Sequence, residues 1–491
     1  MSPDTTLIRR ALWIAGLIAV AGVLGLGPLH RFDDADALIS IFVSLWKWTP
    51  FYWGQARFGM LLPLLAWPLR DPLANLVFQS TASAFCALVS FFLAARYLVR
   101  RPTWPIAGTV GALLALGALP PRLAYLLFPC SGQPYAPSLA LGLLGLLALE
   151  PAPNRSRPNR MARAAGGVGL LALASWVNGS IAAGLAPVVL GRQMLVTWPT
   201  DGWRTAARRT AAELGPVLLT GGAAAWLMRH MNDGNPYFET LPRARWPWAF
   251  HRVGRVLIEE NAGSALLWVV VGVAAVGLAL QAIPRVRPTA RVTLGAILAL
   301  SGSAAAMGFA AAINVWVMRN QFAARYVLPS GFMVFAAVGL LWDVPLGASP
   351  RRASAIPALA VGALLVLCLV RFGAPSLGGV ESAVVHMAPD VSSEVVAEGC
   401  THLIGDYWRS WPLAFLAEQK LRAQGSDQRV WVVSTRSEAT APMWRRVPRA
   451  RWVLCAPVTD LDPARYMVRL DRLPPARFEP VGGLVVGRFS P

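Results

Sequence analysis

The chain contains little charge for its length, and almost none of its basic residues is lysine. Only 14% of its 491 residues are charged, against about 25% in an ordinary soluble protein. Lys47 and Lys420 are the only lysines among 45 basic residues, whereas 55% of all residues are hydrophobic. A soluble enzyme of this size has neither the shortage of charge nor the surplus of apolar residues, so the composition excludes that class.

Several signatures of enzyme chemistry are also absent from the sequence. No Cys/His spacing suits a zinc site. The chain contains neither a glycine-rich phosphate loop nor a serine-nucleophile elbow. Internal repeats, coiled-coil heptads and low-complexity tracts are missing as well. The chemistry of this protein therefore has to be sought in scattered polar residues.

The net charge of +20 and the isoelectric point near 11.1 first suggest a nucleic-acid partner. The positions of the arginines argue against it, because they form short clusters between apolar segments. Such clusters are typical of the cytoplasmic loops of polytopic membrane proteins under the positive-inside rule. The clusters are Arg9-Arg10, Arg100-Arg101, Arg155 to Arg163, Arg204 to Arg209, Arg285 to Arg291 and Arg351-Arg352.

The alternation of apolar runs and arginine clusters predicts a membrane topology. A bilayer core about 30 Å thick takes about 20 apolar helical residues to cross, which gives about 11 crossings, with the N-terminus inside and the C-terminus outside. The first span lacks a cleavage pattern and is interpreted as an anchor. The expected spans are about 8–28, 73–98, 104–120, 134–150, two within 165–196, then 212–230, 264–283, 292–313, 326–343 and 355–372.

Two segments refine this topology. The run 165–196 is too long for one crossing and has basic flanks on both sides, so it is expected to form two short helices with a turn at Asn178-Gly179. The topology places the loops 29–72, 231–263 and 314–325 on the outer side. The first polytopic domain is predicted to span residues 1–373.

The composition changes near residue 374. The segment 374–491 holds 12 of the 25 acidic and 14 of the 45 basic residues, close to the share in soluble proteins. It contains three short apolar runs that read as strands and one amphipathic helical segment. These predict an external C-terminal α/β domain, with strands in 429–433, 451–455 and 483–486 and a helix over 409–424.

The cysteines carry little information. Cys86 and Cys368 fall inside predicted spans, where a thiol behaves as a small apolar residue. Cys130, Cys400 and Cys455 lie on the predicted outer side. In an oxidising compartment Cys400 and Cys455 could form a disulfide within the C-terminal domain, although a sequence alone does not give the pairing.

The first outer loop begins with a group of acids, Asp33, Asp34 and Asp36. In a helix starting there, Asp33 and Asp36 share one face. Crowded carboxylates raise one another's pKa or hold a divalent cation, and either property suits a base that takes a proton from a hydroxyl. The alternative is ordinary helix capping. The apolar positions that follow predict a helix along the membrane surface; they are Ile39, Phe42, Val43 and Trp46.

The same loop continues with an aromatic-rich run over residues 49–59. Aromatic residues are expected at a membrane interface in any case. Gln55 and Arg57 are not, and together with Tyr52 and Trp53 they suit a sugar ring and a lipid phosphate. An interfacial belt and a substrate pocket both remain open at this point.

Two further outer segments contain candidate binding residues. One, over 228–252, contains Glu239; the other contains Arg319 and ends at Arg325 and Tyr326 at the head of a late span. A cation at a helix start is unfavourable, and the positive-inside rule disfavours it outside, so Arg325 is expected to meet an anion. The candidates are a phosphate, or a salt bridge to Glu239, Glu259 or the aspartates.

These residues together resemble a known family. Acids just after the first span, about 11 crossings, Arg325-Tyr326 opening a late span and an external C-terminal domain look like the C-type (GT-C) membrane glycosyltransferases, which include relatives of the protein mannosyltransferases and aminoarabinose transferases. The resemblance implies a sugar donor carried on a polyprenyl phosphate. It also implies that an acid of the first outer loop is the base or a metal ligand.

The resemblance assigns roles with one departure from the family pattern. Asp33-Asp34-Ala35-Asp36 stands where many members have an acid pair followed by an aromatic, so the choice of base stays open between Asp34 and Asp33. Asp34 and Asp36 are candidate ligands of a divalent cation such as Mg²⁺ or Mn²⁺. The donor phosphate is expected at Arg57, Arg325 and Arg319, and the substrate at Tyr52, Trp53, Gln55, Tyr326 and Glu239.

The predicted function is an inverting glycosyltransferase of the bacterial inner membrane. It would move a sugar from a polyprenyl-phosphate donor to a hydroxyl of a glycan, lipid or protein on the outer side, where the C-terminal domain lies. The alternative is a non-catalytic lipid or glycan transporter, or an assembly scaffold. Transporters usually have broken helices in matching halves, and the break near Asn178 has no twin in the sequence. Convergence of the aspartates, Arg57 and Arg325 on one cleft would favour the enzyme.

Overall fold

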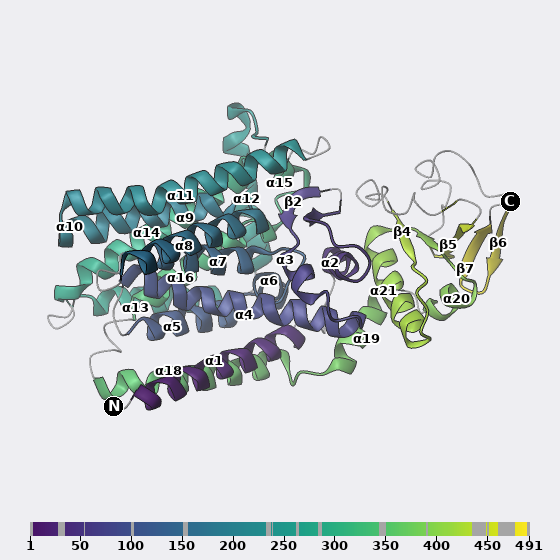
Figure 1. The fold of residues 1–491 in the computed structure, drawn as a ribbon, viewed down its shortest axis with the longest axis horizontal. Helices are drawn as coiled ribbons and strands as arrows, with labels where there is room; N and C mark the ends of the chain where they lie inside the picture. Colours follow the sequence, from purple (N-terminus) through teal and green to yellow (C-terminus); the bar gives the residue numbers. More distant parts are fainter. Residues whose placement is uncertain are drawn as a thin grey trace.

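The molecule consists of a long helical body and a smaller region with a β-sheet at one end of it (Figure 1). The N-terminus lies at the opposite end of the body from the sheet. The structure is a computed structural model. It describes residues 3–27, 35–53, 55–99, 103–150, 156–231, 237, 239–261, 265–282, 287–342, 350–388, 391–434, 448, 451–459 and 477–488.

The helices of the body lie along its long axis, and one occupies each segment expected to span the membrane. They are α1 Pro3–Leu26, α4 Pro72–Val99, α5 Trp104–Ala118, α7 Tyr135–Leu149, α8 Arg157–Val177, α9 Ile181–Arg192, α11 Trp203–His230, α13 Ala265–Leu280, α14 Arg287–Ala312, α16 Leu328–Leu340 and α18 Pro350–Phe372. Shorter helices connect them: α2 Ala35–Leu45, α3 Leu61–Ala66, α6 Pro121–Leu127, α10 Trp198–Asp201, α12 Trp246–Asn261 and α15 Val315–Arg319. One π-helical turn, η2 Gln193–Thr197, and two 3₁₀ turns, η3 Arg243–Arg245 and η4 Ala324–Tyr326, complete the body.

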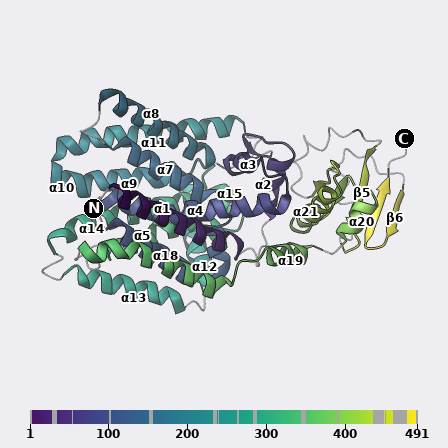
Figure 2. The ribbon, with the colours of Figure 1, turned by 60° about the horizontal axis from the view of Figure 1, so that its bottom comes forward.

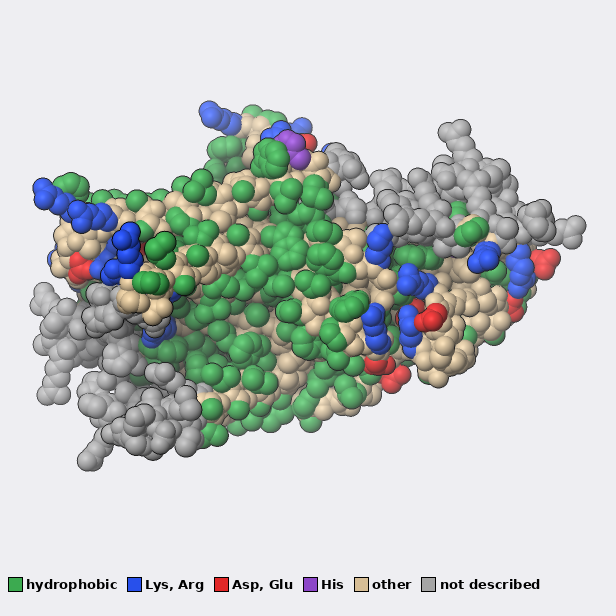
Figure 3. Space-filling model, in the orientation of Figure 1, with side chains coloured by type: hydrophobic (Ala, Val, Ile, Leu, Met, Phe, Trp, Pro, Cys, Tyr) green, Lys and Arg blue, Asp and Glu red, His purple; other side chains and the backbone are tan. Residues whose placement is uncertain are grey.

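The surface and the helix lengths are those of an integral membrane protein. Hydrophobic side chains cover the middle of the body, while charged side chains gather toward its ends and over the sheet region (Figure 3). Within the described residues, four helices are long and apolar enough to cross a bilayer, or five if the bent pair Leu359–Phe372 and Leu377–Met387 is one span. The four are Pro72–Val99, Ile181–Asp201, Trp203–His230 and Ala290–Ala312. The number of crossings, about 11, and their direction stay predictions.

The break predicted inside 165–196 separates α8 from α9. The Asn178 side chain accepts hydrogen bonds from the backbone N–H of Ser180 at 3.1 Å and from its hydroxyl at 2.7 Å. Such a side-chain turn competes with helical hydrogen bonding and ends the helix. The backbone of Asn178 instead forms a bridge with Phe58. Phe58 belongs to a hairpin of β1 Phe51–Tyr52 and β2 Gln55–Gly59, so the first loop is fixed to the break.

The C-terminal region is a five-stranded sheet with three helices. The strand order is β4-β3-β5-β7-β6; β3 pairs parallel with β4 and β5, and β7 pairs antiparallel with β5 and β6. Strands β4, β5 and β7 occupy the three predicted runs, whereas β3 and β6 were not predicted. The elements are α19 Leu377–Met387, α20 Ser392–Ala397, β3 His402–Ile404, α21 Tyr407–Ala423, β4 Trp431–Val433, β5 Val453–Pro457, β6 Arg477–Val481 and β7 Leu484–Arg488.

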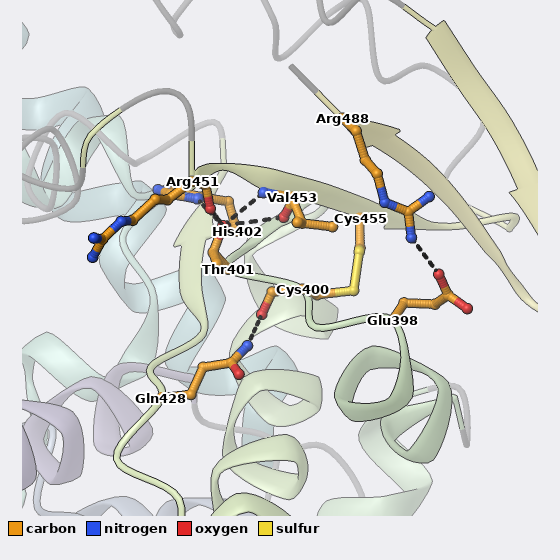
Figure 4. The surroundings of a disulfide bond; sticks show 9 residues. All are labelled: Glu398, Cys400, Thr401, His402, Gln428, Arg451, Val453, Cys455 and Arg488. Carbon is orange, nitrogen blue, oxygen red and sulfur yellow. Dashed lines mark hydrogen bonds and ion pairs between the residues drawn. A yellow bond between two sulfur atoms is a disulfide. The ribbon is translucent and has the colours of Figure 1, made fainter. Parts of the chain in front are cut away.

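A disulfide joins Cys400 to Cys455 and closes a segment of 55 residues (Figure 4). Cys400 lies two residues before the start of β3, and Cys455 lies in the middle of β5, so the bond links the start of β3 to the neighbouring strand. Beside it the Gln428 side-chain amide donates to the Cys400 carbonyl oxygen at 3.1 Å. This pairing, left open by the sequence, ties α21 and β4 into one closed loop, because both lie between the two cysteines.

Helix α2 is buried inside the protein, whereas its apolar pattern predicted a helix along the membrane surface. All 11 of its residues are buried, and it packs between α3 and α4 on one side and α21 on the other. Figures 1 and 2 both place α2 at the end of the body that faces the sheet region. The Phe42 ring lies 5.2 Å from that of Trp411, and Trp46 lies 4.6 Å from Trp431. The apolar stripe therefore faces a protein domain, which a single sequence cannot distinguish from lipid.

Glu418 of α21 is a carboxylate inside this shared core. Its side chain is fully buried, and Oε1 accepts a hydrogen bond from Arg422 Nε at 3.0 Å. Burial raises the pKa of Glu418 above its ordinary value of 4.5, against the opposing effects of the Trp46 indole and Arg422. The folded protein therefore holds this proton to a higher pH than the unfolded chain. The resulting stabilisation is complete below about pH 4.5 and is lost as the pH rises through the raised pKa.

A Glu418→Gln variant is therefore expected to lose part of the pH dependence of stability. Between pH 4.5 and 7.5 its unfolding temperature should fall less than that of the wild type, because glutamine does not titrate. Thermal unfolding of the two purified proteins over this range measures the difference. Glu381→Gln, at an exposed position of α19, is the matched control and should follow the wild type. Identical slopes for Glu418→Gln and the wild type would contradict the assignment.

Candidate functional site

A polar ladder on α4 fixes α2 and with it Asp36. The Asn75 amide donates to Ser44 Oγ at 2.9 Å, and Gln79 Nε2 donates to Asn75 Oδ1 at 2.8 Å. Ser40 Oγ in turn donates to Gln79 Oε1 at 3.1 Å. All four side chains are at most 1% exposed. Buried polar groups hold a position strongly only when they are paired, and here each one joins α2 to α4.

Gly132 brings a second segment against Asp36. A Cβ at this glycine would lie 2.7 Å from the Ala37 nitrogen and 3.0 Å from Asp36 Cβ. Any side chain there would push α2 away, so the turn between α6 and α7 requires glycine at this point. No sequence pattern indicated this role, because a single glycine in a loop has many explanations.

Asp36 lies at the centre of a group of polar side chains from four parts of the chain. It is 3% exposed. The Tyr407 hydroxyl donates to Oδ1 at 2.5 Å, and the Tyr52 hydroxyl lies 3.4 Å from the same oxygen. The Arg325 guanidinium lies 4.0 Å from Oδ2. Burial, with the Asp36 carboxylate beside it, raises the pKa of Tyr407 well above 10, so this hydroxyl keeps its proton at neutral pH and remains a donor.

Arg57 lies close by in an aromatic cage. Its guanidinium carbon is 4.6 Å from the centre of the Phe58 ring, 5.4 Å from Trp316 and 5.7 Å from Tyr237. No carboxylate of the described residues lies within ion-pair distance of it. Aromatic faces stabilise a cation but do not neutralise it. The cage therefore presents a positive charge to the adjoining cavity.

That cavity has a volume of about 360 Å³ and reaches from the hairpin into the helical body. Arg57, Tyr326 and Trp316 line its polar end. The break at Asn178 to Ser180 forms one wall. Much of the rest is apolar, including Ala183, Ala225, Met228, Met307, Ala310 and Ala311 from α9, α11 and α14, although Thr240 and Asn314 also line the cavity. The cavity thus combines one cationic end with a hydrophobic channel.

Arg325 and Tyr326 stand between the cavity and Asp36. The Tyr326 hydroxyl accepts from Trp316 Nε1 at 3.1 Å, and Arg325 Nη2 donates to it at 3.4 Å. Of the carboxylates considered as partners of Arg325, Glu259 pairs with Arg255 at 2.7 Å and Glu239 is exposed. Among the carboxylates that the structure describes, Asp36 lies 4.0 Å from the Arg325 guanidinium. Arg325 therefore faces an aspartate of the first loop.

The remaining predicted residues lie apart from this centre or outside the described residues. Trp53 is buried against Trp431, with ring centres 6.0 Å apart, and donates to the Lys47 carbonyl oxygen at 3.2 Å. Gln55 begins β2, and its side chain is not described. Arg319 ends α15 and is exposed, and Glu239 joins Val315 through its backbone. Asp33 and Asp34 lie outside the described residues.

The predicted divalent cation finds few ligands in the described part of the site. No three His, Cys, Asp or Glu side chains gather anywhere in the residues that the structure covers. Asp36 is the carboxylate present, and it faces two tyrosine hydroxyls and a guanidinium rather than further acids. One carboxylate is not a sufficient donor set for Mg²⁺ or Mn²⁺. Asp33 and Asp34 lie outside the described residues, so the roles of Asp34 and Asp36 as ligands stay predictions.

Sequence reasoning missed Tyr407, Trp316 and Tyr135. Tyr407 belongs to the run Gly405-Asp-Tyr-Trp408 of the C-terminal domain, 371 residues from Asp36. Trp316 and Tyr135 line the cavity from α15 and α7. No spacing rule connects segments so far apart; the excess of aromatics in the outer loops is the one signal that pointed to them.

Comparisons with known proteins give one informative match. No family model matches this chain, and no curated protein matches it. The crystal structure of ArnT from Cupriavidus metallidurans bound to undecaprenyl phosphate is similar with a TM-score of 0.51 and 14% identity, over 99% of this chain and 98% of that one. The apo structure of the same ArnT has a TM-score of 0.37 and 15% identity over the same shares of the two chains. The architecture expected from the resemblance to GT-C enzymes is thus confirmed at the level of the fold: this chain has the fold of ArnT over almost its whole length.

Proposed function

We propose that this protein is a membrane glycosyltransferase that takes its sugar from a polyprenyl-phosphate carrier. The observation that carries the proposal is the cavity of about 360 Å³ with Arg57 at one end and an apolar wall formed by α9, α11 and α14. A polyprenyl phosphate has the same two parts, an anionic head and a long hydrocarbon chain. The fold shared with an ArnT that binds undecaprenyl phosphate supports the same donor class.

In this proposal the donor phosphate lies against Arg57, with Tyr326 and Trp316 beside it. The isoprenoid chain follows the apolar lining between α9, α11 and α14. The guanidinium of Arg57 suits a phosphate because it offers planar, paired N–H donors and keeps its charge when buried. Burial lowers the pKa of Arg57, and the tyrosines and Asp36 around it more than offset that effect, so its pKa is raised and the side chain stays cationic.

The reaction is a substitution at the anomeric carbon of the sugar. An acceptor hydroxyl oxygen forms the new bond, the bond to the donor phosphate oxygen breaks, and polyprenyl phosphate leaves. The hydroxyl proton goes to a first-loop carboxylate, Asp34 or Asp33, and attack opposite the leaving group inverts the anomeric centre. Arg57 compensates the charge that builds on the departing phosphate. We place the acceptor on the outer side of the bacterial inner membrane, together with the sheet region.

Binding of undecaprenyl phosphate tests the site. We expect Arg57→Gln to weaken binding of this probe to the purified protein by about 10- to 100-fold, since a hydrogen bond to a charged group contributes about 1.5–3 kcal/mol. Arg57→Lys keeps the charge but loses the paired donors, so its affinity for the probe should lie between those of the wild type and Arg57→Gln. Arg319→Gln is the matched control, because this arginine is exposed at the end of α15. Equal affinities for Arg57→Gln and the wild type would overturn the placement.

The enzyme is distinguished from a transporter by its products. The purified protein in nanodiscs is incubated with labelled polyprenyl-phosphate sugars and an extract of envelope glycolipids, and free polyprenyl phosphate and glycosylated product are measured together. Stoichiometric appearance of both supports transfer. If neither forms while the same protein in liposomes moves the labelled lipid between leaflets, the protein is a transporter.

A further inference from the structure

The C-terminal domain reaches the proposed transfer site with the polar side chain of Tyr407. Tyr407 is 5% exposed, and its hydroxyl is 2.5 Å from Asp36 Oδ1 and 3.3 Å from the Tyr52 hydroxyl. Beside it, the α2 segment and α21 make aromatic and apolar contacts, such as Phe42 against Trp411, and the Glu418 carboxylate lies near the Trp46 indole. A phenylalanine at position 407 would preserve that apolar packing, so the docking of the domain does not account for the hydroxyl.

Local structure fixes where this hydroxyl stands. Strand β3 ends at Ile404, and Asp406 caps the next helix by accepting a hydrogen bond from the Trp408 backbone N–H at 2.9 Å. Tyr407 is consequently the first residue of α21, at the carboxyl end of a strand paired on both sides. Its ring packs edge-on against Trp408 at 5.2 Å. A capped helix start held by a sheet leaves this side chain little freedom.

The contact decides which way the Asp36 carboxylate faces. Oδ1 is held by the Tyr407 hydroxyl, with the Tyr52 hydroxyl close to the same oxygen. Oδ2 then faces the Arg325 guanidinium at 4.0 Å. Arg325 in turn donates to Tyr326, which lines the cavity. A chain of contacts therefore runs from the sheet region to the wall of the cavity.

We propose that the C-terminal domain supplies Tyr407 as a positioning residue of the transfer site, one that orients Asp36 and, through it, Arg325. This inference rests on the proposed function. It makes the sheet region part of the site rather than an appendage that binds the acceptor alone. Tyr407 itself takes no proton and forms no bond to the sugar.

The test is the Tyr407→Phe variant of the full-length protein. We expect the rate constant of single-turnover transfer to fall about 10-fold or more, as for the loss of a hydrogen bond to a charged group, while affinity for undecaprenyl phosphate stays within about twofold of the wild type. A purely structural role would not separate these two quantities. Transfer at the wild-type rate, or an equal loss of donor affinity, would overturn the proposal.

Tyr97→Phe is the matched control. Tyr97 is also a fully buried tyrosine that donates to a carboxylate, that of Glu213, but on α4 and α11 away from the cavity. The Tyr97→Phe variant should have a lower unfolding temperature than the wild type and an unchanged transfer rate. If Tyr407→Phe behaves like Tyr97→Phe, its hydroxyl contributes to stability alone and the proposal fails.

A second readout separates this inference from the proposed function. Amide hydrogen exchange over residues 35–45 does not depend on sugar transfer. Tyr407→Phe should speed exchange in the first turn of α2, around Asp36, and leave α21 unchanged. If the wild type transfers no sugar, the proposed function fails while this exchange still decides whether Tyr407 positions Asp36. Unchanged exchange in α2 would overturn the positioning role.

Discussion

Asp34→Asn is expected to reduce sugar transfer by about 10²- to 10⁴-fold, the contribution of a general base, while the unfolding temperature stays that of the wild type. Asparagine keeps the shape of the side chain and its capacity to cap a helix, but it cannot accept a proton. Asp34 directly precedes Ala35, the first residue of α2. Single-turnover transfer with each purified variant measures the loss, and Asp33→Asn should rank second in severity.

Asp36→Asn tests whether the Asp36 carboxylate stabilises the structure, in contrast to a base whose loss would affect transfer alone. Asp36 is buried and accepts a hydrogen bond from Tyr407, with Arg325 beside it. Its replacement leaves the guanidinium without that charge, so we expect both transfer and stability to fall, the latter by about 3 kcal/mol. Full activity in Asp33→Asn and Asp34→Asn would leave these two residues with a capping role only, and the base would have to be sought elsewhere.

Arg192→Leu is expected to destabilise the protein by about 3–5 kcal/mol, the usual effect of removing one partner of a buried ion pair. Arg192 is 1% exposed at the end of α9. It contacts Glu150 at 2.5 Å and Glu213 at 3.4 Å, and stacks on the Tyr97 ring at 3.9 Å. Gln193, the first residue of the π-helical turn, also donates to Glu213, at 2.9 Å. Leucine would remove the guanidinium that contacts both carboxylates.

The exposed ion pair between α10 and α11 provides the control for this variant. Arg209 pairs with Asp201 at 2.7 Å, but these side chains are 20% and 39% exposed, and such pairs contribute about 0–1 kcal/mol. Arg209→Leu should therefore change the unfolding temperature little. The Arg192 cluster lies about 22 Å along α11 from Met228 at the cavity, so the folded fraction of Arg192→Leu should bind undecaprenyl phosphate normally. Equal unfolding temperatures for the two arginine variants would contradict the buried network.

Sequence patterns were sufficient for the helices and the break between them. The length of each apolar run indicates the length of its helix, and the turn at Asn178-Gly179 depends on residues that are adjacent in the chain. The face of α2 was misassigned, because Phe42 and Trp46 are equally suited to lipid and to the aromatic surface of α21. Strands β3 and β6 escaped notice because their sequences, HLI and RFEPV, contain polar or charged residues and form no continuous apolar run.

For the site, the sequence could not predict which residues far apart in the chain lie together. Arg57 and Arg325 could be singled out locally, Arg57 because an aromatic belt does not explain it and Arg325 because the positive-inside rule disfavours a cation on the predicted outer side. Arg319 satisfies the same rule but is exposed, because the rule concerns the side of the membrane and not the neighbours of a side chain. Tyr407 and Gly132 contact Asp36 only through the fold, so no pattern in their own segments predicted it.

The contact between Asp36 and Tyr407 also fixes when the site is completed during synthesis. These residues are 371 positions apart, which at about 5–20 residues per second separates their emergence by roughly 20 to 75 s. During that interval α2 has no α21 to cover its aromatic face, and Asp36 lacks the hydroxyl that orients it. A chain that stops before β3 keeps the residues that line the cavity but lacks the Tyr407 hydroxyl that orients Asp36. On the proposed function, we therefore expect such a fragment to transfer sugar more slowly than the full chain.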